Sequence, residues 1–169
     1  MAKKTDMEII TEEKISKGGI LVKFYFDIQS NEKEKLQPVL VDLINNKLLK
    51  EKGVVYGYGR IHDPLEKNGV FITSAVVTLL FENFGSVIKT IFDYVPIGIE
   101  VLRPEKELQL KTPELQSILL DISDISSAYS KYILEKVMNQ EEIKKLNEQL
   151  QNRKEMGERV MKGFGNDEK

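Results

Sequence analysis

The sequence predicts an α+β fold, in which one antiparallel sheet carries helices on one face and is followed by a long helical extension. Three observations support this prediction. Four segments between residues 20 and 104 have the residue pattern of β-strands, and two amphipathic segments with helical spacing separate them. A further apolar repeat with helical spacing begins near residue 112, beyond the last of these strands.

The first 19 residues are polar and charged, and they end in the glycine pair Gly18 and Gly19. Glycine pairs of this kind punctuate a chain where its structure changes. We therefore expect residues 1–19 to form an N-terminal arm and a linker. No apolar stretch long enough for a signal peptide occurs in them.

Residues 20–29 predict the first strand, because apolar and polar side chains alternate along them. Val22, Phe24 and Phe26 fall on one side of such a strand, and the residues between them fall on the other. A period of two residues is typical of a strand with one buried face.

Residues 30–53 predict an amphipathic helix that ends at Gly53. Leucine, isoleucine and valine recur in this segment at helical spacing, with lysine and glutamate elsewhere. Pro38 restricts where the helix begins, because proline removes a backbone donor and clashes with the preceding turn. We therefore expect the regular helix to start at residues 35–37, with Pro38 in its first turn.

The remaining elements up to residue 104 follow the same logic. Residues 54–61 alternate again, and residues 70–81 are rich in β-branched side chains, so each segment predicts a strand. Turn-forming residues at 62–69 join these strands into a hairpin. Residues 84–95 predict a second helix, and residues 97–102 predict a fourth strand.

The order of these elements, β-α-β-β-α-β, resembles that of the ferredoxin-like, or split βαβ, family of folds. The resemblance covers residues 20–104 and rests on the order of elements. It implies an antiparallel sheet with helices on one face and the other face open. Enzymes, RNA-binding proteins, metallochaperones and amino-acid sensors share this fold, so the resemblance implies an architecture and no particular activity.

A long apolar helix is expected over residues 112–138. Thr112, Pro113 and Glu114 are typical of a helix start. Apolar residues then recur at intervals of three and four, close to the 3.5-residue period of paired helices. This seam consists of Leu115, Ile118, Ile122, Ile125, Tyr129 and Tyr132. We expect it to pack against the open sheet face or against a second copy of the chain.

Residues 139–169 predict a charged helical tail. They contain seven basic and seven acidic residues and few apolar ones. Salt-bridge pairs one turn apart contribute only about 0.3 kcal/mol each, so we expect a frayed tail that a partner protein stabilises. The sequence leaves open whether this tail continues the preceding helix or begins a separate one.

The composition excludes several kinds of site. The 169 residues include no cysteine and only one histidine, His62, which excludes disulfides, thiol nucleophiles and metal sites built from cysteine or several histidines. We therefore expect no metal and no cofactor.

No apolar run approaches the roughly 18–20 residues of a membrane span, so we expect a cytoplasmic protein. The abundance of lysine, glutamate and isoleucine is typical of hyperthermophile proteins and also of AT-rich genomes.

The most suggestive group of side chains lies on the strand faces that alternate away from the predicted helices. This assignment takes Gly57 and Gly59 to mark the face on which a helix packs closely. The candidate open-face residues are Lys23, Tyr25, Asp27, Tyr56, Tyr58 and Arg60. Exposed aromatic residues on such a face can stack on RNA bases. A net charge of −2, spread evenly along the chain, disfavours that role, and we favour packing against the C-terminal helix or a second subunit.

Two short motifs that could carry chemistry have simpler explanations. Gly57 and Gly59 lie inside a predicted strand rather than before a helix, which favours packing over phosphate binding. Arg60, His62 and Asp63 have acid–base potential, but they lie together on a turn, where Asp63 before a proline is ordinary turn chemistry.

We therefore expect a non-enzymatic, self-associating protein: a homo-oligomer with a charged tail available to another protein. A small-ligand sensor that binds at a subunit interface is the first alternative. An RNA-binding module that uses the open sheet face is the second.

Overall fold

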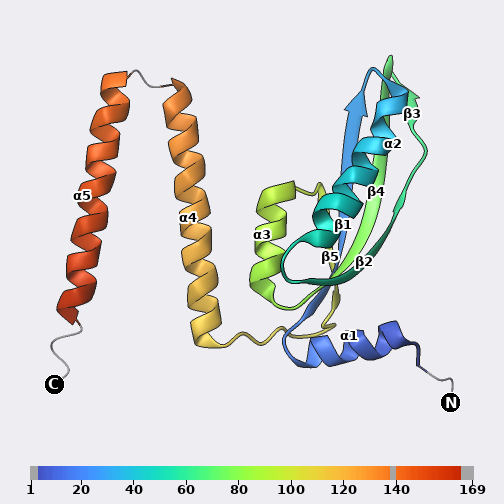
Figure 1. Ribbon diagram of the computed structural model, residues 1–169, viewed down its shortest axis with the longest axis horizontal. Helices are drawn as coiled ribbons and strands as arrows, with labels where there is room; N and C mark the ends of the chain where they lie inside the picture. The colour runs from blue at the N-terminus through green and yellow to red at the C-terminus, as the bar shows by residue number, and fades with distance from the viewer. Residues whose placement is uncertain (1–3, 138–139, 165–169) are drawn as a thin grey trace. The chain divides into compact units, whose positions relative to one another are not determined.

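The computed structural model describes residues 4–137 and 140–164 (Figure 1). The chain divides into two compact units, Met1–Ile118 and Leu119–Lys169. In chain order the elements are α1 (Asp6–Ser16), β1 (Ile20–Ser30), α2 (Lys33–Asp42), a π-helical turn (Leu43–Lys47), a 3-10 turn (Leu48–Lys50), β2 (Val54–Ile61), β3 (Leu65–Lys67), β4 (Val70–Phe81), α3 (Phe84–Tyr94), β5 (Gly98–Arg103), α4 (Thr112–Val137) and α5 (Gln140–Phe164).

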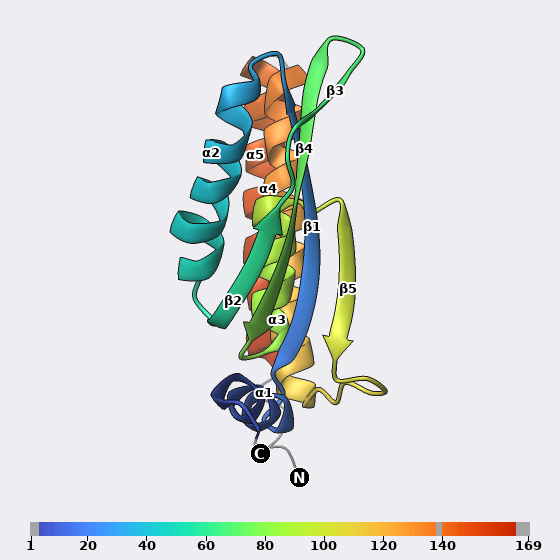
Figure 2. The ribbon, with the colours of Figure 1, turned by 90° about the vertical axis from the view of Figure 1, so that its right-hand side faces the viewer.

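The first unit is a mixed α/β structure built on a five-stranded open sheet (Figure 2). The strand order is β2-β4-β1-β5, with β3 pairing with β4 alongside this path, and every pair is antiparallel. The predicted antiparallel sheet with helices is therefore confirmed. β1 and β4 pair along their full length, from Ile20 opposite Phe81 to Ser30 opposite Phe71.

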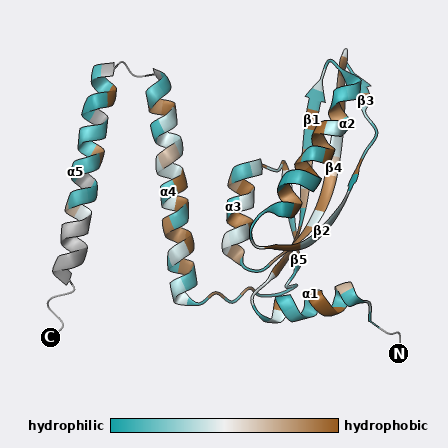
Figure 3. Ribbon diagram, viewed as in Figure 1, coloured by the Kyte–Doolittle hydropathy of each residue, from teal (hydrophilic) through white to brown (hydrophobic). Residues whose placement is uncertain are grey.

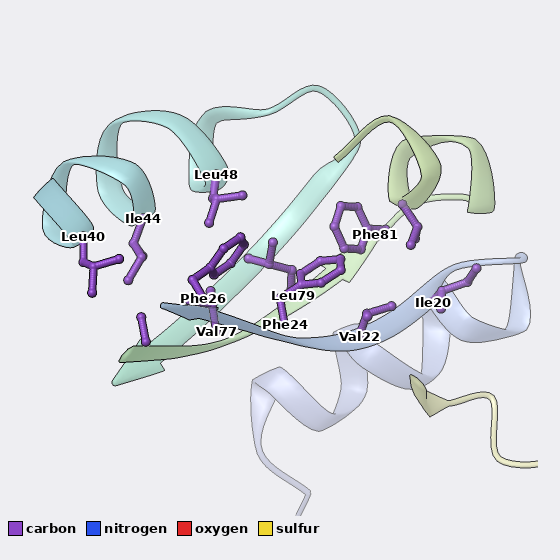
Figure 4. Close-up of a cluster of buried hydrophobic side chains, with 12 residues drawn as sticks. Ile20, Val22, Phe24, Phe26, Leu40, Ile44, Leu48, Val77, Leu79 and Phe81 are labelled. Carbon is purple, nitrogen blue, oxygen red and sulfur yellow. The ribbon is translucent and has the colours of Figure 1, made fainter. Parts of the chain in front are cut away.

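One face of the sheet packs against α2 and α3 to form the core. In Figure 4 alternate side chains of β1 and β4 point toward Leu40, Ile44 and Leu48, which come from α2 and the two turns that follow it. Val87 of α3 belongs to the same cluster. Phe24 and Phe81 meet edge to face at its centre, with ring centroids 6.0 Å apart. This cluster fixes which face of each strand is covered.

The start predicted for the helix over residues 30–53, which is α2 in the structure, is wrong. The helix begins at Lys33, so Pro38 is its sixth residue and lies beyond the first turn. Proline has no N–H, so the helical hydrogen bond to the carbonyl of Glu34 is missing. The helix keeps the earlier turn because it buries Leu36, which is 2% exposed, one turn before the buried Leu40.

The hairpin between β2 and β4 is longer than the sequence suggests. β3 forms within the segment predicted to be a turn, with Leu65 opposite Ile72 and Lys67 opposite Val70. The reversal itself is confined to Asn68 and Gly69, whose φ angles are +54° and +78°. Both residues tolerate this left-handed region, as tight hairpin turns require. β4 extends beyond the residues that pair with β2, and its first residues, Val70–Ile72, pair with β3.

The ends of α3 follow from its sequence. The side chain of Asn83 accepts a hydrogen bond from the Ser86 N–H at 2.9 Å, so Asn83 caps the helix as predicted. Val95 ends the helix in the left-handed region with φ +45°. β5 begins at Gly98, one residue after the predicted start.

Two helices occupy the C-terminal part of the chain. α4 ends at Val137 and α5 begins at Gln140, so the described residues form separate helices on either side of residues 138 and 139. No helix in the described part of the chain is both long enough and apolar enough to cross a membrane.

Candidate functional site

The second face of the sheet carries the polar and aromatic residues singled out from the sequence. Opposite residues in an antiparallel pair project from the same face. Tyr25 and Arg60 both lie opposite Val76, while Lys23 and Tyr58 both lie opposite Thr78. By the same alternation one face, called the open face below, carries Lys23, Tyr25, Asp27, Tyr56, Tyr58 and Arg60.

Gly57 points the other way, toward the helices. A β-carbon at Gly57 would lie 2.3 Å from Leu79 Cδ2 and 2.6 Å from Leu49 Cδ2. Any larger residue at position 57 would require these two leucine side chains to move. The Gly57–Gly59 pair therefore allows close packing of the strand.

A hydrogen-bonded group links β1 to the edge strand β5 on the open face. The Glu100 carboxylate accepts from Lys23 Nζ at 2.8 Å and from the Tyr25 hydroxyl at 3.0 Å. The hydrogen bonds from Lys23 and Tyr25 lower the pKa of Glu100, and the bond to Glu100 raises the pKa of Lys23. Gly98, opposite Tyr25, leaves space for the tyrosine ring. The group stabilises the negative charge of Glu100 and ties the edge strand to β1 on this face.

α1 lies across one end of the open face, within the segment predicted to be an arm and linker. Thr5 and Glu8 form a capping box that starts the helix. Thr11 Oγ1 lies 2.6 Å from the Tyr56 hydroxyl, and Lys14 forms an ion pair with Glu82 at 3.2 Å. The open face is therefore covered at this end.

The burial of Leu80 agrees with the position of α1 over this end of the open face. Leu80 lies opposite Leu21 and Tyr56, on the face away from the core, yet it is fully buried. The unbroken apolar run Leu79-Leu80-Phe81 is the feature of the sequence that indicates this burial. A strand covered on both faces loses the alternation of apolar and polar residues. For α1 itself, the local sequence signal is the Thr5–Glu8 capping box.

A groove of about 610 Å³ lies beside the contact between Thr11 and Tyr56 and is lined by residues of α1 and of the open face. Its apolar lining includes Met7, Ile15 and Leu21. The rings of Tyr56 and Tyr58 form one wall, with centroids 6.5 Å apart and planes inclined by 14°. Tyr58 is 53% exposed, so one aromatic ring is available to a molecule in the groove.

The charges around this groove are paired with one another. Lys4 forms an ion pair with Glu12 at 2.6 Å, and Arg103 pairs with Glu105. Such exposed pairs are weak, so a bound anion can compete with either carboxylate.

The turn residues with acid–base potential are not joined into a catalytic group. The backbone of His62 pairs with Ser74, and Asp63 accepts from Gln37 Nε2 at 3.4 Å. Arg60 projects from the open face of β2. Within residues 4–137 and 140–164, no group of three or more histidine, cysteine, aspartate or glutamate residues could hold a metal ion.

The residues of the predicted helical seam differ in their surroundings. Ile118 is 5% exposed and belongs to the first unit, where Gly85 of α3 is its neighbour. Ile122 and Ile125 are half-buried. The exposed apolar residues of α4 are Leu115, Leu119, Leu120, Tyr129, Tyr132 and Ile133.

α5 is mostly hydrophilic, in contrast to α4 (Figure 3). Its described apolar side chains include Leu150, at 42% exposed, and Met156, at 67%. Gln151 and Glu155, one turn apart, form a hydrogen bond at 3.5 Å.

A model of the MJ0538 family matches residues 21–167. The chain belongs to the MJ0538 family. No curated protein and no solved structure matches it. The matched residues begin in β1 and extend past the end of α5, so the match covers the sheet and both C-terminal helices of this chain, and α1 lies before it.

Proposed function

We propose that the chain is a non-enzymatic protein that associates with itself through α4. The surface involved, called the α4 seam below, consists of Ile122, Ile125, Tyr129 and Tyr132, flanked by Leu119 and Ile133. The observation that carries the proposal is that Leu119, Tyr129, Tyr132 and Ile133 are each 53–60% exposed in one copy of the chain.

The spacing of these residues favours another helix as the partner surface. They recur at intervals of three and four, which keeps them on one side of the helix over several turns. Leu119 directly follows Ile118, and Ile133 directly follows Tyr132, so both residues widen the apolar side of the helix. Fully burying one such side chain contributes about 1.5–3 kcal/mol, so several of them together are needed to offset the roughly 4–15 kcal/mol that association costs.

Light scattering across a dilution series tests the proposal. We expect an oligomer at micromolar concentration, and a strictly monomeric species over the whole series would contradict it. Tyr129→Glu with Ile133→Glu should reduce the measured mass, because each introduced charge would be buried in the interface. Both side chains are exposed in the single chain, so the fold tolerates them. Ser127→Glu, which adds one negative charge to α4 away from the seam, is the control and should leave the mass unchanged.

We also propose that residues 20–103 adopt the ferredoxin-like arrangement. In a split βαβ unit, the two strands that a helix connects are not neighbours in the sheet. One strand that belongs to the other half of the fold lies between them. β1 and β2, which α2 connects, have β4 between them. β4 and β5, which α3 connects, have β1 between them. This interleaving of the two halves supports the assignment.

The groove beside α1 favours a second candidate function, the sensing of a small ligand. An apolar lining, an exposed tyrosine ring and two weakly paired cations suit a planar molecule that carries an anionic group. A thermal-shift screen with amino acids and nucleotides tests this idea. A ligand that raises the melting temperature of the native chain should lose its effect in Tyr58→Ala, while a blank panel would contradict the sensor.

A further inference from the structure

Four apolar residues at alternate positions form an exposed strip that begins at the end of α3 and continues into the edge strand β5. The exposed fractions of Val95, Ile97, Ile99 and Val101 are 67%, 66%, 46% and 60%. Ile99 lies opposite Phe24, and so it projects from the helix-covered side of the sheet. The strip, called the β5 strip below, therefore shares a face with the core but is not itself covered.

The edge of β5 is open to pairing. β5 pairs with β1, and within the described residues its other edge has no partner strand. Natural edge strands are commonly protected by charges or prolines. The one acidic residue of β5, Glu100, projects from the opposite face, where Lys23 and Tyr25 hold its carboxylate. This edge thus lacks a charged side chain on the face of the β5 strip.

The backbone before β5 adds a second indication. Val95 has φ +45°, a region that β-branched residues rarely occupy because of steric strain. The residue kept in this conformation projects an apolar side chain into water. Strained residues concentrate at sites where the surrounding structure uses them, and an interface is such a use.

We propose that β5 pairs antiparallel with β5 of a second copy, so that the two sheets become continuous. A two-fold axis normal to the sheet relates the copies, and Ile99 lies opposite Ile99 of the second copy. Ile97 then lies opposite Val101 of the second copy, which buries the strip against itself. Centring the pair on Glu100 instead would place two carboxylates directly opposite each other, and like charges there are destabilising.

The hydrogen bonding of β5 is compatible with this register. The Ile97 N–H donates to the Tyr25 carbonyl at 2.8 Å, toward β1. The Tyr25 carbonyl that accepts this bond points toward β5, and Gly98 lies opposite Tyr25. Backbone groups alternate in direction along a strand, so those of Gly98 and Glu100 point toward β1, and those of Ile99 point to the free edge. In the proposed register Ile99 lies opposite Ile99 of the second copy, and these two residues exchange the hydrogen bonds. The β-bulge where Val101 and Arg103 pair with β1 ends the regular edge just beyond them.

This interface is separate from the α4 seam and does not depend on the proposed function. Disulfide cross-linking of the full chain tests it directly, because the native sequence contains no cysteine. Residues opposite each other that exchange hydrogen bonds have Cα atoms about 5.5 Å apart, within the range that a disulfide spans. Ile99→Cys should therefore form a covalent dimer under mild oxidation, seen on a non-reducing gel.

The matched control is Leu65→Cys, which places an exposed thiol on β3, away from β5. We expect Ile99→Cys to cross-link at least tenfold faster than this control at equal concentration. Equal rates for the two variants would overturn the proposal. A second measurement is the mass of Ile99→Lys, which should fall below that of the native chain, and an unchanged mass would also overturn it.

The same cross-link distinguishes the two interfaces. Ile99→Cys should still form the dimer when Tyr129→Glu and Ile133→Glu are present in the same chain. Loss of the cross-link in that background would overturn β5 pairing as an independent interface. A cross-link that persists when the α4 variants leave the native mass unchanged would support β5 pairing and contradict the α4 seam.

Discussion

Thr11 Oγ1 lies 2.6 Å from the Tyr56 hydroxyl and so joins α1 to the sheet. The direction of this hydrogen bond follows from its neighbour. Thr11 Oγ1 also donates to the Met7 carbonyl at 2.6 Å, which uses its one proton. The Tyr56 hydroxyl is therefore the donor to Thr11, and both groups are satisfied at the contact between helix and sheet.

Thr11→Val should weaken the attachment of α1. Valine keeps the shape of threonine and removes the acceptor for Tyr56, so we expect the free energy of unfolding to fall by about 0.5–1.5 kcal/mol. Urea unfolding of Thr11→Val, Tyr56→Phe and the double variant measures the coupling between the two groups. Ser16→Ala is the control, since that hydroxyl bonds only within α1, to the Glu13 carbonyl. A coupling energy near zero would contradict the assignment.

Leu80→Ala should be much more costly than its position on the second sheet face suggests. Leu80 is fully buried, so removing its side chain leaves a cavity, and we expect a loss of about 2–5 kcal/mol. Leu65→Ala, at a residue 73% exposed, should change stability by less than about 0.5 kcal/mol. Denaturant unfolding of both variants provides the comparison, and similar losses would show that α1 does not cover Leu80.

Periodicity was sufficient to predict β2 and β4, which match residues 54–61 and 70–81 at both ends. Their patterns are dominated by burial on one side, which a single sequence records directly. α1 could not be found in this way, because its polar surface faces water and its contacts with the sheet, such as the hydrogen bond that Tyr56 donates to Thr11, join segments far apart in the chain. Its capping box was the only local signal.

The candidate site was predictable to a similar extent. Alternation alone places Tyr25, Tyr56 and Tyr58 on one face, because register follows from the buried residues between them. It does not record that α1 lies beside Tyr56 or that Glu100 accepts from Tyr25, since both contacts join segments far apart in the chain. The exposed strip on β5 was missed for a related reason: an apolar residue in a strand indicates a buried face, and only the sheet order shows which strand is at the edge.

Pro38→Ala should stabilise the chain. Alanine restores the N–H that can donate to the Glu34 carbonyl and removes the clash with the preceding turn of α2, and we expect a gain of about 1–3 kcal/mol in the free energy of unfolding. Part of this gain is offset because proline also restricts the unfolded chain. Val39→Ala, next to it and 54% exposed, is the control for the loss of a side chain without a backbone change. A lower melting temperature for Pro38→Ala would indicate that the helix requires the proline.

The stability of the chain should fall between pH 10 and about 12 because of Tyr94. Burial, and then the hydrogen bond to Glu51, raise the pKa of Tyr94 to about 12, whereas an unfolded tyrosine titrates near 10. The folded state therefore holds this proton more tightly. The contribution of Tyr94 to the free energy of unfolding is complete below pH 10 and is lost as the pH rises toward 12.

Tyr94→Phe removes both the hydroxyl and its titration. The variant should be less stable than the native chain at pH 9, because Glu51 loses one of its two side-chain donors and keeps Lys89. The difference in unfolding free energy between the two proteins should then shrink from pH 10 to 12, as the native tyrosine ionises beside Glu51. Urea unfolding of both proteins at intervals of half a pH unit measures this difference. Other alkaline titrations affect both chains alike, so a constant difference would show that Tyr94 titrates normally.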